Sequence, residues 1–337
     1  MAEDIYEKSK QIIETNNHND ITYRKISSSK SQCLVCPNKC ILKENQSGAC
    51  FVRSNKLGKI ILSEYGKIST ISVDPIEKKP FYHYKPGSKT ISFGGFGCSM
   101  RCDYCENYKI SQNNIKENTK FFYPNDLCSI ARQKNCDILC FTYNEPTTYF
   151  EYMIDIYDSC LQNNMYFIIK TNGYVRRNIW KEICNNVHAM NIDWKGEGEF
   201  YRKTTLVKDN VTLDNIYIAK SLNKHVEISV PVYYDSSLKD YDNFISLIEK
   251  IDKNIPVHLI KIYPSNKIKY TNLTSDFLLY NLFDYMKNKL SYVYIQGSIN
   301  DYHRNTTCHN CSKLIVERQS LKSFFHGECC QNCPIIY

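Results

Sequence analysis

Six short apolar runs, rich in β-branched and aromatic residues, recur from about residue 90 onward and constrain the fold more than any other feature. Longer amphipathic stretches separate them, such as residues 147–162, where apolar side chains recur at intervals of three and four. This alternation is typical of βα units on a parallel sheet whose face is covered by helices. The runs are residues 90–95, 138–143, 165–171, 188–194, 225–232 and 257–263, and a late run at 291–297 can add a further strand. The sequence therefore predicts an α/β fold.

Chemically capable residues follow these runs at their carboxyl ends. In a (β/α) barrel the carboxyl ends of the strands converge on one mouth, where active sites lie. We therefore expect one pocket to collect these residues. The groups that follow the first four runs are a three-cysteine loop, Asn144-Glu145-Pro146, Asn172-Gly173 and Asp193-Trp194-Lys195.

The three-cysteine loop places Cys98, Cys102 and Cys105 within eight residues. A closed structural zinc site needs four ligands, whereas this loop offers three. Three thiolates can hold three irons of a [4Fe-4S] cluster and leave the fourth iron open to an exogenous ligand. S-adenosylmethionine carries an amine and a carboxylate that can chelate that iron, and one electron into its sulfonium would release methionine and a 5′-deoxyadenosyl radical. Tyr104 offers a flat ring for the adenine. The alternatives are a half-formed zinc site or a group of buried thiols.

The loop resembles the signature of the radical S-adenosylmethionine enzymes: a cysteine, three residues, a cysteine, two residues of which the second is aromatic, and a cysteine. Further stretches resemble the branch that includes the glycyl-radical-enzyme activating enzymes, and within it the AmmeMemoRadiSam-system radical enzymes. The resemblance implies a partial (β/α)6 TIM-like barrel of the radical S-adenosylmethionine type, with a [4Fe-4S] cluster and S-adenosylmethionine as cofactors. The stretches that carry it are residues 74–88, 141–152, 170–174, 199–205 and 305–318, together with the loop.

The resemblance assigns cofactor contacts to four strand-end residues. Glu145 matches the acidic residue that receives the methionine amino group, and Asn172 matches a polar contact to the cofactor. Asp193 and Lys195 match an Asp-x-Lys motif whose residues touch cofactor or substrate and whose aspartate helps to hold a monovalent cation. Trp194 stands here in place of the usual leucine. The alternative for each residue is a strand-end cap or a surface ion pair.

Two histidines and two tyrosines lie in or just after the later runs. His225 and His258 belong to apolar strands, where a lone histidine is more often a satisfied core residue than a ligand. Tyr233 and Tyr263 lie near the expected mouth and can contact substrate there.

Two further groups of cysteines flank the predicted barrel. The C-terminal group, with Cys329 as an adjacent alternative, has the spacing of a zinc ribbon, although a single iron or an auxiliary cluster stays open. The N-terminal group suits zinc or a second iron–sulfur cluster equally. We expect an N-terminal extension over residues 1–85, the barrel over 86–300 and a C-terminal module over 301–337. The two groups are Cys308, Cys311, Cys330 and Cys333 at the C-terminal end, and Cys33, Cys36, Cys40 and Cys50 at the N-terminal end.

The composition of the chain indicates whether it crosses a membrane and in which cellular compartment we expect it. No stretch approaches 18 uncharged apolar residues, which argues against a membrane span, and the sequence begins with neither a basic nor an apolar leader segment. Seventeen cysteines in such a chain point to metal or redox chemistry, because cytosolic thiols are kept reduced. We therefore expect a soluble, cytoplasmic protein.

The leading hypothesis is an enzyme that forms a 5′-deoxyadenosyl radical and removes a hydrogen atom from a substrate, which we expect to be a protein or peptide. A more specific version activates a glycyl-radical enzyme. A flavodoxin or ferredoxin is the expected electron donor. The competing hypothesis is a zinc-ribbon protein that binds nucleic acid through its net charge of +8. We disfavour it because basic residues do not concentrate around the cysteines.

Overall fold

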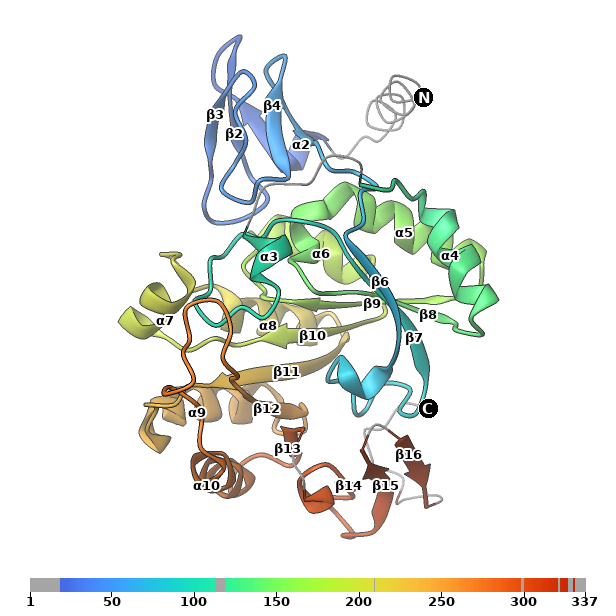
Figure 1. Ribbon diagram of the computed structural model, residues 1–337, viewed down its shortest axis with the longest axis vertical. Helices are drawn as coiled ribbons and strands as arrows, with labels where there is room; N and C mark the ends of the chain where they lie inside the picture. Colours follow the sequence, from blue (N-terminus) through green and yellow to red (C-terminus); the bar gives the residue numbers. More distant parts are fainter. Residues whose placement is uncertain are drawn as a thin grey trace.

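The computed structural model describes residues 19–112, 119–208, 210–297, 300–320, 322–326 and 330. Across these residues the largest sheet has eight strands in the order β13-β12-β11-β10-β9-β8-β7-β6 (Figure 1). β6 pairs antiparallel with β7, whereas each later neighbour pair is parallel. The strands are β6 (Thr70–Pro75), β7 (Lys89–Gly94), β8 (Ile138–Phe141), β9 (Tyr166–Thr171), β10 (Ala189–Asp193), β11 (His225–Val232), β12 (Val257–Lys261) and β13 (Val293–Gln296).

The predicted α/β fold is confirmed. All six predicted strands are present in parallel order, and the late run forms β13 at one edge. β6 forms the other edge, so the sheet is open, as expected of a partial barrel. β6 was not predicted from the sequence, since it precedes residue 86, and yet it belongs to the main sheet. The division of the chain near residues 85 and 300 stays a prediction.

Helices connect the parallel strands and form one layer. α4 packs on α5, α5 on α6, α6 on α8 and α8 on α9, while α10 packs on β12 and β13. Their sequences favour helix locally: α4, for example, begins with a proline at its first turn, and Asp126 accepts a hydrogen bond from the backbone N–H of Tyr123 at 2.8 Å. The helices of this layer are α4 (Pro124–Gln133), α5 (Phe150–Gln162), α6 (Arg177–Asn185), α8 (Thr212–Ser221), α9 (Asp242–Asp252) and α10 (Asp276–Lys287), while α7 (Gly198–Thr205) lies between β10 and α8 in the chain.

The two faces of the sheet differ in polarity. In β11, Ile228 and Val230 belong to the main hydrophobic core, whereas their neighbours Glu227 and Ser229 point to the opposite face. The same alternation in β7, β9 and β10 places apolar residues under the helices and polar residues such as Ser92, Lys170 and Asn191 on the inner face. Ile138, Cys140 and Ile168 form a smaller apolar cluster on that inner face. The inner face therefore supplies polar groups to a buried interior, which apolar strands alone would not.

Glu227 is the centre of the polar floor of this interior. Its buried carboxylate accepts hydrogen bonds from the backbone N–H groups of Tyr82 and His83, both at 2.9 Å. It also contacts Nε2 of His225 at 3.0 Å and Nε2 of His258 at 2.7 Å. Both histidines therefore have the core role that was expected. Residues 82–83 are fixed by the same carboxylate against the inner face.

Smaller elements lie at the two ends of the molecule (Figure 1). The N-terminal strands form a three-stranded and a two-stranded sheet, and the last strands form another three-stranded sheet at the opposite end. No helix within the described ranges is both long and apolar enough to cross a membrane. The remaining elements are α2 (Asn19–Thr22), β1 (Tyr23–Lys25), β2 (Lys30–Cys33), β3 (Ile41–Lys43), β4 (Arg53–Lys56), β5 (Lys59–Leu62), η1 (Ile76–Lys78), α3 (Tyr108–Ser111), η2 (Pro146–Tyr149), η3 (Leu238–Tyr241), η4 (Asp301–His303), β14 (Thr306–Thr307), β15 (Leu314–Gln319) and β16 (Lys322–Phe325).

We predict that Glu227→Gln lowers the free energy of unfolding by about 2–4 kcal/mol, because four donors lose a charged acceptor in a buried site. Urea denaturation followed by circular dichroism measures this change. Glu249→Gln, at an exposed position, is the matched control and should change stability by less than about 0.5 kcal/mol. Equal effects of the two substitutions would contradict the role of Glu227.

Candidate active site

The loop after β7 carries Cys98, Cys102 and Cys105 and packs closely on its surroundings. Gly97 has a φ of +68°, a conformation that other residues rarely adopt. A Cβ atom at Gly97 would also lie 2.0 Å from the backbone oxygen of Cys50. Glycine at this position is thus required by the backbone conformation and by the contact with the N-terminal segment.

Asn144 clamps the start of this loop. Its Oδ1 accepts a hydrogen bond from the backbone N–H of Gly95 at 2.9 Å, and its Nδ2 donates to the carbonyls of Phe96 at 2.8 Å and Gly97 at 3.2 Å. The side chain satisfies three buried backbone groups that have no strand partner. The sequence analysis assigned no role to Asn144, although it belongs to the Asn-Glu-Pro motif.

Two other segments, at residues 265–266 and at Asn38, bind the backbone of the cysteine loop. Ser265 Oγ donates to the carbonyl of Cys105 at 2.9 Å, and Asn266 Nδ2 donates to the carbonyl of Cys102 at 2.8 Å. Asn38 Nδ2 donates to the carbonyl of Ser99 at 3.0 Å. These bonds fix the backbone from outside and leave the thiols as the reactive groups of the loop.

The three thiols of the loop are not gathered as closely as the ligands of a single tetrahedral zinc ion would be. None of the three forms a disulfide. Their sulfurs do not all lie within 4.8 Å of one another, a distance that, among the described residues, only the group of Cys308, Cys311 and Cys330 meets. Zinc–sulfur bonds of about 2.3 Å place tetrahedral ligands about 3.8 Å apart. In a [4Fe-4S] cluster each thiolate binds a different iron, which sets the sulfurs further apart.

The surroundings of Cys98 and Cys102 favour the neutral form of these two thiols until a metal binds. Burial raises the pKa of Cys102 to about 11, although the nearby ammonium of Lys195 opposes the shift. Burial, and next the carboxylate of Glu145, raise the pKa of Cys98 well above its usual value. Metal binding at these thiols therefore releases protons.

Glu145 joins the ends of β8 and β9. Its buried Oε1 accepts hydrogen bonds from Thr171 Oγ1 at 2.6 Å and from Thr147 Oγ1 at 2.7 Å, and its Oε2 accepts one from the backbone N–H of Asn172 at 2.8 Å. Burial raises the pKa of Glu145, and these hydrogen bonds act in the opposite direction. The carboxylate lies at the predicted strand end, but most of its hydrogen-bonding capacity is used within the protein.

Asn172 links Glu145 to the cysteine loop. Its Nδ2 lies 3.2 Å from Ser99 Oγ and 3.6 Å from the Cys98 sulfur, while its Oδ1 accepts from the backbone N–H of Tyr174 at 2.9 Å. The side chain therefore contacts one of the thiols directly. This is the position expected of a residue that touches a cofactor bound to the loop.

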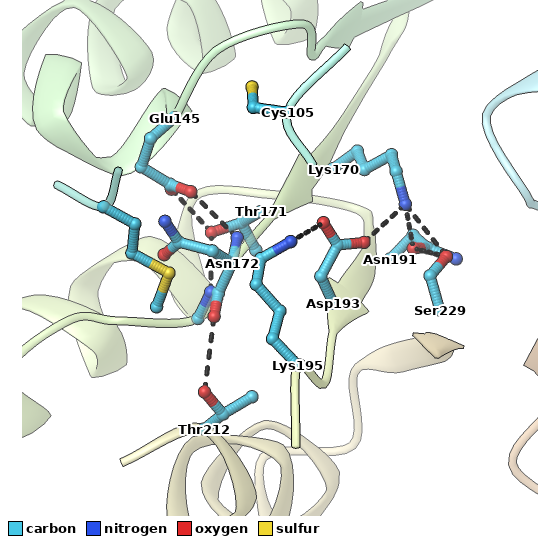
Figure 2. A network of polar contacts seen from close by, with 12 residues as sticks. Cys105, Glu145, Lys170, Thr171, Asn172, Asn191, Asp193, Lys195, Thr212 and Ser229 are labelled. Atoms are coloured by element: carbon cyan, nitrogen blue, oxygen red, sulfur yellow. Dashed lines mark hydrogen bonds and ion pairs between the residues drawn. The ribbon is translucent and has the colours of Figure 1, made fainter. Parts of the chain in front are cut away.

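Asp193 lies between two lysines (Figure 2). Its Oδ1 is 2.6 Å from Lys170 Nζ and its Oδ2 is 2.8 Å from Lys195 Nζ. Burial opposes ionisation of the aspartate, but the two ammonium groups outweigh it and lower its pKa to about 2. Lys170 also donates to Asn191 at 2.9 Å and to Ser229 at 2.8 Å. Sequence reasoning missed Lys170, whose position in the strand gives no sign that it faces the interior.

Tyr104 lies beside these charges. Its ring is 5.5 Å from Lys195 Nζ and 5.5 Å, edge to face, from the ring of Tyr233. Its buried hydroxyl has no hydrogen-bond partner among the described residues. Tyr233 in turn donates to Asp103, so it contacts the cysteine loop rather than open space. The structure thus gathers the five predicted cofactor contacts and the three cysteines at one edge of the sheet.

The two flanking cysteine groups occupy different places. The N-terminal group packs on the cysteine loop, whereas the C-terminal group lies with β14–β16 at the other end of the molecule (Figure 1). The sulfurs of Cys308 and Cys330 are 3.3 Å apart, and both lie within 4.8 Å of the sulfur of Cys311. These three side chains can hold a metal ion. Cys329 and Cys333 lie outside the described residues.

Comparison with known proteins identifies the class. No family model matches the chain. An uncharacterized protein of Methanocaldococcus jannaschii is 33% identical over 307 residues, which are 88% of this chain and 90% of that protein. The 4-hydroxyphenylacetate decarboxylase activating enzyme of Clostridium scatologenes is 21% identical over 226 residues, 61% of this chain and 71% of that enzyme.

Among solved structures, Streptococcus suis SuiB bound to S-adenosylmethionine matches with a TM-score of 0.50 and 14% identity over 61% of this chain and 49% of SuiB, so the match spans about half of that protein. The fold and the cysteine loop are those of the radical S-adenosylmethionine enzymes. The chain belongs to the family of the Methanocaldococcus jannaschii protein.

We predict that Asn144→Asp weakens cluster binding, because an aspartate retains the acceptor for Gly95 but loses both donors to the loop carbonyls. Iron per chain after anaerobic reconstitution should fall to less than about half of the wild-type value if the loss matches the cost of two buried hydrogen bonds. Asn223→Asp, at an exposed site, is the matched control and should retain full iron. Equal iron in both variants would contradict the clamp.

We predict that Asp193→Asn lowers the free energy of unfolding by about 2–4 kcal/mol at neutral pH, because two ammonium groups lose their shared anion. The folded-state pKa of Asp193, about 2, is below the unfolded value of about 3.9. Its contribution is therefore present above about pH 4 and is lost as the pH falls toward 2. The difference between wild type and variant should shrink over that range in chemical denaturation, with exposed Asp158→Asn as the control.

Proposed function

We propose that the protein is an enzyme that binds a [4Fe-4S] cluster through Cys98, Cys102 and Cys105 and cleaves S-adenosylmethionine reductively. The observation that carries this proposal is a loop, fixed by Asn144, that presents three thiols beside Glu145 and Asn172. The bound cluster would supply one electron and an open coordination position. The bound cofactor in the SuiB structure and the activating-enzyme relative support the same chemistry.

The residues at this edge of the sheet would position the cofactor. Glu145 Oε2 accepts one hydrogen bond from the described residues, so it retains a lone pair for the methionine ammonium. Asn172 would hold the cofactor next to Cys98. Asp193 would contribute to cation or substrate binding through its ion pairs with the two lysines, and the ring of Tyr104 would contact the adenine.

We propose a protein or peptide as the substrate. SuiB has been solved with its precursor peptide SuiA bound, at a TM-score of 0.50 over 66% of this chain. Aromatic side chains also lie exposed near the strand ends, where a peptide can pack on them: Phe200 and Tyr234 are each 39% exposed and Tyr263 is 50% exposed. The relationship to an activating enzyme supports the more specific version, in which the substrate is a glycyl-radical enzyme.

The expected compartment and electron donor follow from the same chemistry. We propose the cytoplasm as the compartment, because seventeen cysteines and an oxygen-sensitive cluster need reducing conditions. A flavodoxin or ferredoxin would supply the electron.

The C-terminal group would bind zinc, since its three close sulfurs fit tetrahedral coordination and the sequence places Cys333 as a fourth ligand.

The first test of the enzyme is the formation of 5′-deoxyadenosine. Anaerobically reconstituted protein with dithionite and S-adenosylmethionine should form it, and the Cys98→Ala/Cys102→Ala/Cys105→Ala variant should form at least about 100-fold less, as when a catalytic group is removed. Cys136→Ala, a buried thiol ahead of β8, controls for the loss of a thiol as such. Wild-type protein that holds iron but releases no 5′-deoxyadenosine would overturn the proposal.

The C-terminal metal is tested separately. Cys308→Ala/Cys311→Ala should lose about one zinc per chain, because two of four ligands are removed, while the iron content stays unchanged. Elemental analysis of anaerobically purified protein measures both metals. Loss of iron instead of zinc in this variant would show that the module holds an iron centre.

A further inference from the structure

The four N-terminal cysteines lie on segments that pack together in the N-terminal sheets. Cys33 ends β2, Cys36 and Cys40 lie in the connection to β3, and Cys50 precedes β4. The backbone N–H of Cys33 donates to the carbonyl of Cys40 at 2.9 Å, which brings the two sides of the connection together. Cys33, Cys36 and Cys50 are buried, and none of the four forms a disulfide.

The thiols lie close enough to influence one another. Burial raises the pKa of Cys36 well above its usual value, and Cys33, Cys50 and Cys40 raise it further. Cys33 likewise raises the pKa of Cys50 after burial. Three buried thiols and one partly buried thiol that influence one another are the kind of group that metal sites require, whereas thiols dispersed in a hydrophobic core do not need to gather.

A buried cation without a full set of partners lies beside these thiols. Arg53 is 1% exposed and makes a bidentate ion pair with Glu151, with both distances at 2.6 Å. Its Nε is buried and has no acceptor among the described residues. The positive charge of the guanidinium opposes the burial effect on the pKa of Cys33 and of Cys50. A buried N–H without an acceptor is costly, and a thiolate or a bridging sulfide of an anionic cluster would satisfy it.

The spacing of the sulfurs separates zinc from a cluster. No three of the four sulfurs lie within 4.8 Å of one another, whereas the sulfurs of the C-terminal group do. The N-terminal thiols are therefore not gathered around one point as closely as the ligands of a single tetrahedral zinc ion would be. We propose that Cys33, Cys36, Cys40 and Cys50 bind a second iron–sulfur cluster, with Arg53 as the hydrogen-bond donor at its edge.

This second site lies directly against the radical-cluster loop. Cys36 belongs to the same buried group as Met100 and Cys102, and the carbonyl of Cys50 packs on Gly97. Arg101 donates to the carbonyl of Ala49, and its guanidinium lies 4.5 Å from the centre of the Phe51 ring. A redox centre here would thus contact the loop that holds the radical cluster, although its existence does not depend on cleavage of S-adenosylmethionine.

Metal analysis of two full-length variants tests the proposal. The Cys98→Ala/Cys102→Ala/Cys105→Ala variant should retain about four irons and four sulfides per chain and show an electron paramagnetic resonance signal after reduction by dithionite. Addition of Cys36→Ser to this variant should remove or shift that signal, whereas addition of Cys136→Ser should leave it unchanged. Circular dichroism confirms that each variant is folded.

The outcomes separate this proposal from the proposed function. A triple variant without iron, whether it holds two zinc ions per chain or one, overturns the second cluster. If the triple variant holds as much iron as wild type, the second cluster is supported. Cys98, Cys102 and Cys105 would then hold no iron, which would contradict the radical cluster. Arg53→Lys retains the charge but lacks Nε, so in the triple variant it should shift the signal; an unchanged spectrum would remove Arg53 from the site.

Discussion

The hydrogen bonds between the Asn144 side chain and the turn at Gly95–Gly97 are the interactions on which the candidate site depends. A loop that must present three thiols cannot form regular structure, so its buried backbone groups need partners from elsewhere. Asn144 supplies three such bonds, and Ser265, Asn266 and Asn38 supply others. The loop is thereby held by elements that are distant in sequence, which couples the cysteine geometry to the whole fold.

The candidate site also depends on the polar groups of the inner face of the sheet. Charged groups such as Lys170 and Asp193 lie on it in compensating pairs, because an unpaired buried charge would destabilise the fold by several kcal/mol. Glu227 plays the corresponding role at the floor, where it accepts from histidines and from backbone groups. The interior is thus polar enough for a charged cofactor, while the opposite face of the same strands forms the apolar core.

Local sequence patterns predicted the parallel strands and the polar residues at their ends, because these features depend on short segments of the chain. The period of the apolar runs predicted the parallel strands, and the strand-end positions of Glu145, Asn172 and Asp193 predicted that they would lie together. Three features depend on contacts between distant segments and were not predictable: the clamp by Asn144, the inward position of Lys170 and the packing of the N-terminal cysteines on the radical-cluster loop. The edge strand β6 was missed because it precedes the βα repeat.

The most direct measurement of the central claim is electron nuclear double resonance of the reduced protein with S-adenosylmethionine labelled by ¹⁷O in its carboxylate and ¹⁵N in its amine. The account predicts a coupling of both labels to the cluster held by Cys98, Cys102 and Cys105, because three thiolates leave one iron open. Bound S-adenosylmethionine that shows no coupling of either label would mean that the cluster has no open position for the cofactor, and it would contradict the account.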